Sequence, residues 1–135
     1  MSRSPREVVE AWSIAFNRQD ADALSALYAE RAVNWQVNDQ PLEGRAAICE
    51  SFRHLFRAFP DIGHAIVNLL EEGEWAALEW DGWGTHRGEF VGHPPSGRSF
   101  RLRGCGFFQV RDGLIVLQRG YWDRFTWFDQ IGLSI

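Results

Sequence analysis

The chain has 135 residues, near the most common size of one domain, and 45% of them are hydrophobic, which is enough for a single core. Aromatic residues make up 14%, with seven Trp and ten Phe, a content that suits wide gaps between a sheet and helices or the walls of a cavity for a flat apolar ligand. The net charge is −4 and the 14 basic residues are scattered, so the sequence shows no basic patch that could bind a phosphate backbone. We therefore expect no nucleic-acid partner.

Helical signals occupy the first sixty residues. The sequence SPRE at 4–7 combines an N-cap Ser, a Pro at the first helical position and a Glu three residues after the cap, and it predicts a helix to residue 17. A second, short helix is predicted after Asp20 and over 21–28, and a first strand over 32–37. The apolar stripe of 46–59, ended by Pro60, predicts the third helix.

From Gly63 onward the apolar pattern alternates, which is typical of strands. We predict one hairpin from 64–70 and 75–85, and a second from 100–110 and 114–122, joined by an irregular stretch at 88–97. Helices followed by strands indicate an α+β domain spanning 1–135, with three N-terminal helices packed on one face of a strongly curved antiparallel sheet.

Several short motifs occur in a consistent order: GTHRGEF at 84–90, HPPSGR at 93–98, VRDGLI at 110–115, YWD at 121–123 and QIG at 130–132. With the element order, they resemble the SnoaL-like polyketide cyclase branch of the nuclear transport factor 2-like superfamily. The resemblance implies a cone-shaped α+β barrel. It does not imply one activity, because this fold hosts cyclases, isomerases, epoxide hydrolases and proteins without chemistry.

The catalytic residues that the resemblance implies are not found in this chain. The histidine and aspartate of the polyketide cyclases match Gly106 and Gly120, and the epoxide hydrolase carboxylate also matches Gly120. The tyrosine and the two acids of ketosteroid isomerases match Trp12, Gln36 and Gly106. Glycine cannot transfer a proton, so none of the three mechanisms is intact.

The last two predicted strands carry three glycines on one face. A three-residue turn at 111–113 sets Gly106 opposite Gln118 and Gly104 opposite Gly120. Bulky residues around a glycine hollow leave space for a guest that Gln118 would orient. Two alternatives to an open hollow remain: the glycines permit sharp strand curvature, or an aromatic neighbour covers them. In addition, a two-residue turn at Asp112 and Gly113 would shift the strand register and remove the basis of this prediction.

Further candidates come from strand parity and from the resemblance. Trp80 and Leu78 should face inward, and His86, further along the same strand parity, is the best titratable candidate near a pocket mouth. We therefore predict three catalytic candidates, namely His86, Gln36 and Gln118. The predicted ligand-binding residues are Trp12, Trp35, Trp80, Gly104, Gly106, Phe108, Gly120 and Trp122.

The opposite face of the last hairpin carries an apolar group, Phe107, Ile115 and Leu117, with charged neighbours. Such a patch suits a subunit interface, and the relatives commonly dimerise through this side of the sheet, so we expect a homodimer. In the chosen register Arg101 lies opposite Asp123 and would form an ion pair with it.

Neither a metal site nor a cofactor is predicted, because the histidines lack partners at ligating spacing and no phosphate loop is present. Cys49 and Cys105 are far apart, so we expect two buried, reduced thiols. A secretion signal and a membrane-spanning run are not evident, which predicts a cytoplasmic protein without a membrane partner.

Two functional hypotheses stay open. The first is a cofactor-independent cyclase, isomerase or hydrolase that acts on a polycyclic or terpenoid-like apolar molecule. The second is a small-ligand-binding or dimeric association module without catalysis, which Gly106 and Gly120 favour.

Overall fold

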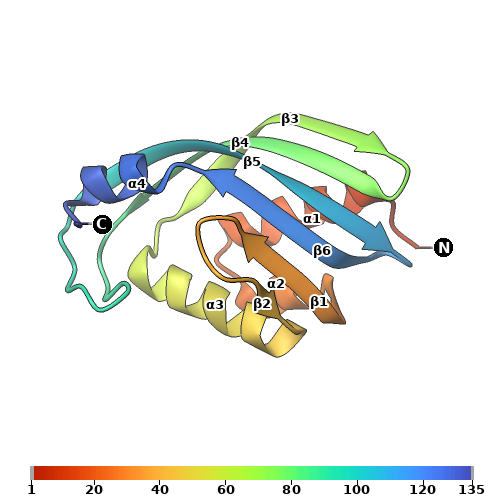
Figure 1. The fold of residues 1–135 in the computed structure, drawn as a ribbon, viewed down its shortest axis with the longest axis horizontal. Helices are drawn as coiled ribbons and strands as arrows, with labels where there is room; N and C mark the ends of the chain where they lie inside the picture. The colour runs from red at the N-terminus through yellow and green to blue at the C-terminus, as the bar shows by residue number, and fades with distance from the viewer. Residues whose placement is uncertain (1, 135) are drawn as a thin grey trace.

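The computed structural model describes residues 2–134 and contains four helices and six strands among them. The N-terminal part holds α1 (Pro5–Asn17), α2 (Ala21–Ser25), β1 (Tyr28–Gln36), β2 (Leu42–Glu43) and α3 (Arg45–Ala58). The remainder holds β3 (Gly63–Glu72), β4 (Trp75–Thr85), β5 (Ser99–Arg111), β6 (Leu114–Trp122) and α4 (Arg124–Ile131). The N-terminal and C-terminal ends lie at opposite ends of the long axis (Figure 1).

The helix starts follow the local chemistry that predicted them. The Ser4 hydroxyl accepts a hydrogen bond from the Glu7 backbone N–H at 3.2 Å, and the Glu7 carboxylate accepts from the Ser4 N–H at 2.9 Å. The Asp20 carboxylate caps α2 by accepting a hydrogen bond from the Ala23 backbone N–H at 3.0 Å. The second helix is shorter than predicted because Tyr28, which is fully buried, already begins β1.

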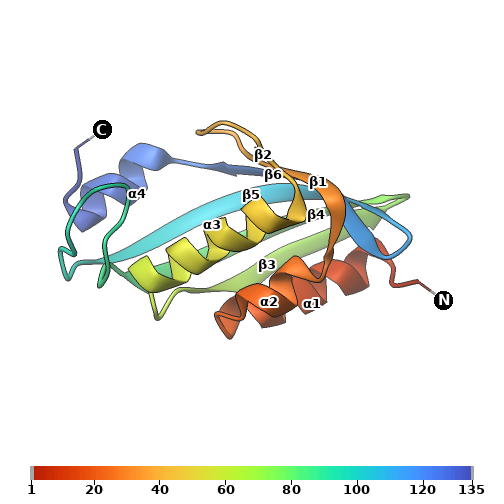
Figure 2. The ribbon, with the colours of Figure 1, turned by 90° about the horizontal axis from the view of Figure 1, so that it is seen from below.

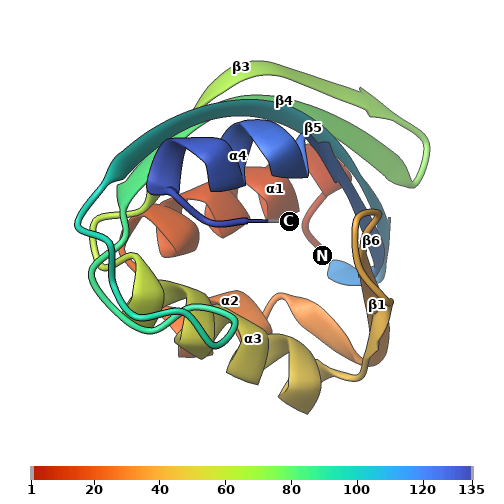
Figure 3. The same cartoon turned by 60° about the vertical axis from the view of Figure 1, so that its left-hand side comes forward.

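All six strands form one curved sheet in the order β2-β1-β6-β5-β4-β3. The predicted α+β class is confirmed, but the prediction of an antiparallel sheet is wrong in one place: β1 runs parallel to β6, and the sheet is therefore mixed. Within residues 2–134 the strand order runs from β2 to β3 without closing into a complete barrel. In Figure 3 the sheet arches over α1 and α4 and descends to β1, while α3 lies across the open side.

The N-terminal helices cover the concave face of this sheet. Figure 2 shows α1, α2 and α3 on the same side of the strands. Contacts join α1 to β3, β4 and β5, and join α3 to β1 and β2. No helix within residues 2–134 is both long and apolar enough to cross a membrane.

The β5–β6 hairpin has a different register from the predicted one. Its turn contains only Asp112 and Gly113, with φ angles of 52° and 76°, as a two-residue Asp-Gly hairpin turn requires. Together with a bulge in β6, this turn sets Gly106 opposite Gly120 and Gly104 opposite Trp122. The bulge leaves Val116 without a register partner. The two-residue turn shifts the alternation of β6 by one residue, and the bulge shifts it back from residue 117 onward, so Gly106 and Gly120 still share the concave face.

The two-residue turn also changes the outer face. Ile115, which the sequence placed on the outer face, pairs with the inward-facing Val110 and is fully buried, whereas Phe107 and Tyr121 on the outer face are 39% and 43% exposed. The predicted ion pair of Arg101 is also wrong: its guanidinium lies 5.6 Å from the Trp83 ring centroid. Cys105 is exposed, contrary to the expectation of two buried thiols.

Helix α4 was not predicted. The Asp123 side chain accepts a hydrogen bond from the Thr126 N–H at 3.2 Å, and Gly132 ends the helix in the left-handed region at φ 77°. The acidic N-cap Asp123 and the terminating Gly132 were visible in the sequence. The eight residues between them contain only two buried side chains, Trp127 and Ile131, which is too few for a clear helical pattern. Trp127 packs the helix against Phe100 of β5 with ring centroids 5.3 Å apart.

Candidate functional site

A cavity of about 700 Å³ lies between the concave face of the sheet and the helices. All six strands and α1, α3 and α4 contribute to its wall, and half of the lining residues are Trp, Phe or Leu. A volume of this size is typical of sites for drug-sized ligands.

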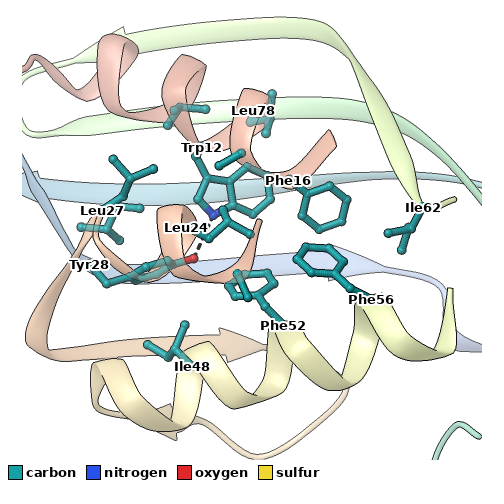
Figure 4. Close-up of a cluster of buried hydrophobic side chains, with 14 of the residues drawn as sticks. Trp12, Phe16, Leu24, Leu27, Tyr28, Ile48, Phe52, Phe56, Ile62 and Leu78 are labelled. Atoms are coloured by element: carbon teal, nitrogen blue, oxygen red, sulfur yellow. Dashed lines mark hydrogen bonds between the residues drawn. The ribbon is translucent and has the colours of Figure 1, made fainter. Parts of the chain in front are cut away.

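Four of the predicted aromatic residues lie on the cavity wall: Trp12, Trp80, Phe108 and Trp122. The Trp12 ring stacks on Phe16 at 5.2 Å between centroids and meets the edge of Phe108 at 5.3 Å. Figure 4 shows Trp12 and Phe16 of α1 directed toward Phe52 and Phe56 of α3. These interlocked rings give the helix-side wall a fixed shape.

The three glycines have different surroundings. A Cβ on Gly104 would lie 2.3 Å from the Trp80 ring, so this glycine is covered by an indole and does not line the cavity. Gly106 and Gly120 do line it. A Cβ on Gly106 would approach the Arg119 carbonyl oxygen to 2.8 Å, and one on Gly120 would approach Gln36 Oε1 to 2.0 Å. The glycine hollow is therefore partly open and partly filled.

Gln118 lies on the cavity wall with its side chain tied to the core. Its Oε1 accepts the hydroxyl hydrogen of Tyr28, and the Tyr28 oxygen accepts the Trp12 indole N–H at 2.9 Å, the bond drawn in Figure 4. Burial raises the pKa of the Tyr28 hydroxyl well above its ordinary value, so the hydroxyl stays protonated and remains a donor.

Gln36 extends over Gly120, the position at which the resemblance implies an acid. Its Oε1 accepts the Trp122 indole N–H at 2.9 Å, and its Nε2 donates to Asn34 Oδ1 at 2.8 Å. Asn34 was not among the predicted site residues, although its alternation with Gln36 along the strand could have indicated it. It lies on the cavity wall and is 5% exposed.

His64 is a second site residue that the sequence analysis missed. It lines the cavity, its Nε2 lies 2.9 Å from the Ser13 hydroxyl oxygen, and its ring contacts Trp12 and Phe16. Burial lowers the pKa of His64 to about 4, so the imidazole is neutral at pH 7. A neutral imidazole exchanges hydrogen bonds but carries no charge into the cavity.

The predicted position of His86 at a pocket mouth is wrong. The side chain is fully buried and lies outside the cavity lining, with Nδ1 3.0 Å from the Ser96 hydroxyl oxygen and the ring stacked on Phe59. Strand β4 ends at Thr85, and the chain then folds back, so the strand alternation no longer applies at residue 86. His86 holds the 86–97 loop against the core, and burial lowers its pKa.

Trp35 does not line the cavity either. It is 39% exposed, and its indole N–H donates to the Asp39 carbonyl oxygen at 3.1 Å. Strand alternation sends Trp35 outward and Gln36 inward, and no bend reverses it. The cavity instead has an ion pair on its wall, between Arg124 of α4 and Asp39 at 2.5 Å.

Within residues 2–134 there is no group of three or more His, Cys, Asp or Glu side chains that could hold a metal ion. The absence of a metal or cofactor in the function stays a prediction. Chemically, the wall offers amide and indole N–H groups, the neutral imidazole of His64, aromatic rings and the Arg124–Asp39 ion pair. Such a set binds and orients an uncharged ring compound and donates hydrogen bonds to it.

The architecture defines the class of protein. Three helices that cover a curved mixed sheet, with a cavity on its concave face, form an α+β fold of the nuclear transport factor 2-like type. A protein of Catenulispora acidiphila described as having a ketosteroid isomerase-like fold, solved in complex with trimethylamine, shares it with a TM-score of 0.83. That match has 19% identity and covers 98% of this chain and 96% of the other, and it shows the fold alone.

The chain belongs to the SnoaL-like polyketide cyclase family, whose sequence model matches residues 6–131. The resemblance seen in the sequence is thereby confirmed. No curated protein matches the chain significantly.

Two solved structures are similar in both sequence and fold. A proposed polyketide cyclase of Xanthomonas campestris pathovar campestris has 26% identity and a TM-score of 0.85, covering 92% of this chain and 93% of the other. IdmH of Streptomyces antibioticus, also a proposed polyketide cyclase, has 27% identity and a TM-score of 0.80, covering 97% of this chain and all of the other.

Proposed function

We propose that this protein binds an uncharged polycyclic or terpenoid-like molecule in the cavity and promotes its cyclisation or isomerisation without a cofactor. The observation that carries the proposal is the 700 Å³ aromatic cavity with the Gln36 and Gln118 amides on its wall. Family membership and the similarity to two proposed polyketide cyclases support the reaction class. Stacked rings would hold the guest, and Gln36 and Gln118 would orient its polar group.

Binding is tested with fluorene, a flat tricyclic hydrocarbon. At ten times its Kd, such a ligand raises the free energy of unfolding by about 1.4 kcal/mol, which a thermal-shift assay resolves. Ser51→Trp would introduce an indole into the cavity from α3, because Ser51 lines it. We expect the variant to lose the shift. The matched control is Glu50→Trp on the exposed side of the same helix, which should keep it.

Catalysis is tested separately with a linear aromatic poly-β-ketone that closes its ring by intramolecular aldol addition. Acceleration by the wild type and by Glu50→Trp, with loss in Ser51→Trp, is the expected result. Absence of shift with fluorene and with the polyketone would refute binding altogether.

A non-catalytic binding module is the second candidate, and one observation favours it. Gly106 and Gly120 carry no acid, and the Gln36 amide occupies the space above Gly120. Fluorene binding without any acceleration of ring closure would support this candidate and reject the enzyme.

A homodimer through the outer face of the sheet remains our prediction. Phe107 and Tyr121 are both exposed there and meet edge to face at 6.1 Å. The paired rings and the surrounding arginines match the expected character of a subunit interface.

A further inference from the structure

Two amide side chains lie next to each other on the cavity wall, on neighbouring strands. Asn34 of β1 and Gln118 of β6 are register partners in the parallel pair, and both side chains line the cavity. Each residue is only 5% exposed. An amide group has a carbonyl oxygen that accepts and an NH₂ that donates, so what it offers a ligand depends on which end is already engaged.

The orientation of Gln118 is dictated by an indole. The Trp12 N–H can only donate, and therefore the Tyr28 oxygen must accept it at 2.9 Å. The Tyr28 hydroxyl then donates its own hydrogen, and Gln118 accepts it with the carbonyl oxygen Oε1. The Gln118 NH₂ is left for the cavity.

The orientation of Asn34 is dictated in the same way by a second indole. The Trp122 N–H can only donate, so Gln36 accepts with Oε1 at 2.9 Å. Gln36 then donates through Nε2 to Asn34 Oδ1 at 2.8 Å, which engages the Asn34 carbonyl oxygen. The Asn34 NH₂ is the group left over.

Neither NH₂ group has a hydrogen-bond partner among residues 2–134, where the side-chain bonds of Gln118 and Asn34 are those to Tyr28 and Gln36. Nor are these nitrogens sealed in the protein: the fully buried side-chain nitrogens without partners belong to His86, Arg119, Arg124 and Trp127. An amide N–H that faces an apolar cavity is costly to leave unpaired when water is expelled. A ligand that fills the cavity must therefore bring an acceptor to this place.

The geometry points to a paired N–H donor site, formed by Asn34 and Gln118, that binds a ketone, ester or enolate oxygen of the ligand. This inference rests on the proposed binding of a ring compound and narrows its class to compounds that carry a carbonyl acceptor on the ring system. Because both donors are oriented before binding in a site of low polarity, they favour an oxygen that gains negative charge, as the oxygen of an enolate does.

The test compares 9-fluorenone with fluorene, which share one tricyclic skeleton and differ by a ketone oxygen in place of two hydrogens. We expect 9-fluorenone to bind the wild type about tenfold more tightly than fluorene does. This factor corresponds to the net contribution of one hydrogen bond of ordinary strength or of two weak ones. Gln118→Met and Asn34→Leu keep the side-chain volume and remove the NH₂ donors. Each should reduce the preference for the ketone and leave fluorene affinity within about twofold.

Gln109→Met is the matched control. Gln109 lies next to Phe108 on β5, but its amide bonds Glu74 on the exposed outer side. This variant should keep the full preference for the ketone. An infrared measurement needs no variant: the carbonyl stretch of bound 9-fluorenone should lie at a lower frequency than in hexane, and return toward the hexane value in the two donor variants that fold.

The outcomes separate this inference from the proposed function. Equal affinities for the two probes, with a carbonyl stretch as in hexane, overturn the donor site while ring binding stands. Failure of both probes to bind overturns ring binding and the donor site together. A ketone preference that persists in Gln118→Met and Asn34→Leu also overturns the assignment of the donors.

Discussion

The buried imidazole of His64 should make the protein less stable in mild acid. Its ring lies against Trp12 and Phe16, and its Nε2 meets the Ser13 hydroxyl. Burial lowers the pKa of His64 to about 4, from 6.5 for an ordinary histidine. Between these two values the unfolded chain binds a proton that the folded chain does not.

The sign and size follow from that difference in bound protons. The free energy of unfolding keeps the full contribution above pH 6.5 and falls as the pH drops through the window from 6.5 to 4, by up to about 1.4 kcal/mol per pH unit. From pH 7.5 to pH 5.0 a folded pKa of about 4 corresponds to a loss of about 2 kcal/mol.

Urea unfolding at pH 7.5 and pH 5.0 measures this loss, with the free energy taken from the midpoint and the slope. His64→Gln should lose about 2 kcal/mol less than the wild type between the two pH values, since it has no imidazole to protonate. Other titrating groups, including His86, whose pKa is also lowered by burial, contribute to both proteins and cancel in the comparison.

Ser13→Ala is the control that separates burial from the hydrogen bond. Burial alone accounts for the lowered pKa of His64, so Ser13→Ala should retain the wild-type loss on acidification. An equal loss in the wild type and in His64→Gln would refute the reasoning.

Two further predictions concern the sheet. Gly120→Ala should lower the free energy of unfolding by about 1–3 kcal/mol in urea, because its Cβ would displace the Gln36 amide and break the bond from the Trp122 indole. In a Gln36→Ala background the same change should cost much less, and an undiminished cost would contradict this account. The wild type should sediment at twice the 15.5 kDa of one chain, and Phe107→Lys should sediment as a monomer. A wild-type monomer, or a Phe107→Lys dimer, would contradict the predicted interface.

Local chemistry in the sequence was sufficient for most of the elements. The capping box at Ser4, the apolar stripe of α3 and the alternation after Gly63 act over a few residues, and the structure follows them closely. Helix α4 escaped prediction because it is held in place by Trp127, whose ring packs against Phe90 and Phe100. Both of these residues lie about thirty positions earlier in the chain.

Some residues of the candidate site could likewise be predicted from the sequence, and others could not. Strand alternation put Gln118 and Trp80 on the concave face, and the family resemblance gave Gln36 a pocket position; all three line the cavity. Alternation failed for His86, where the strand had already ended, and could not reveal His64, whose importance comes from packing against α1.

The sequence by itself determined the element order apart from β2 and α4, the fold class, and the inward face of β4 and β5, because periodicity and capping depend only on near neighbours along the chain. The tertiary structure decided the parallel pairing of β1 with β6, which sets Asn34 beside Gln118. It also decided which amide end faces the cavity, since two tryptophan N–H groups from distant segments orient both hydrogen-bond chains. Hydrogen-bond direction depends on partners brought together by folding, and no local pattern encodes it.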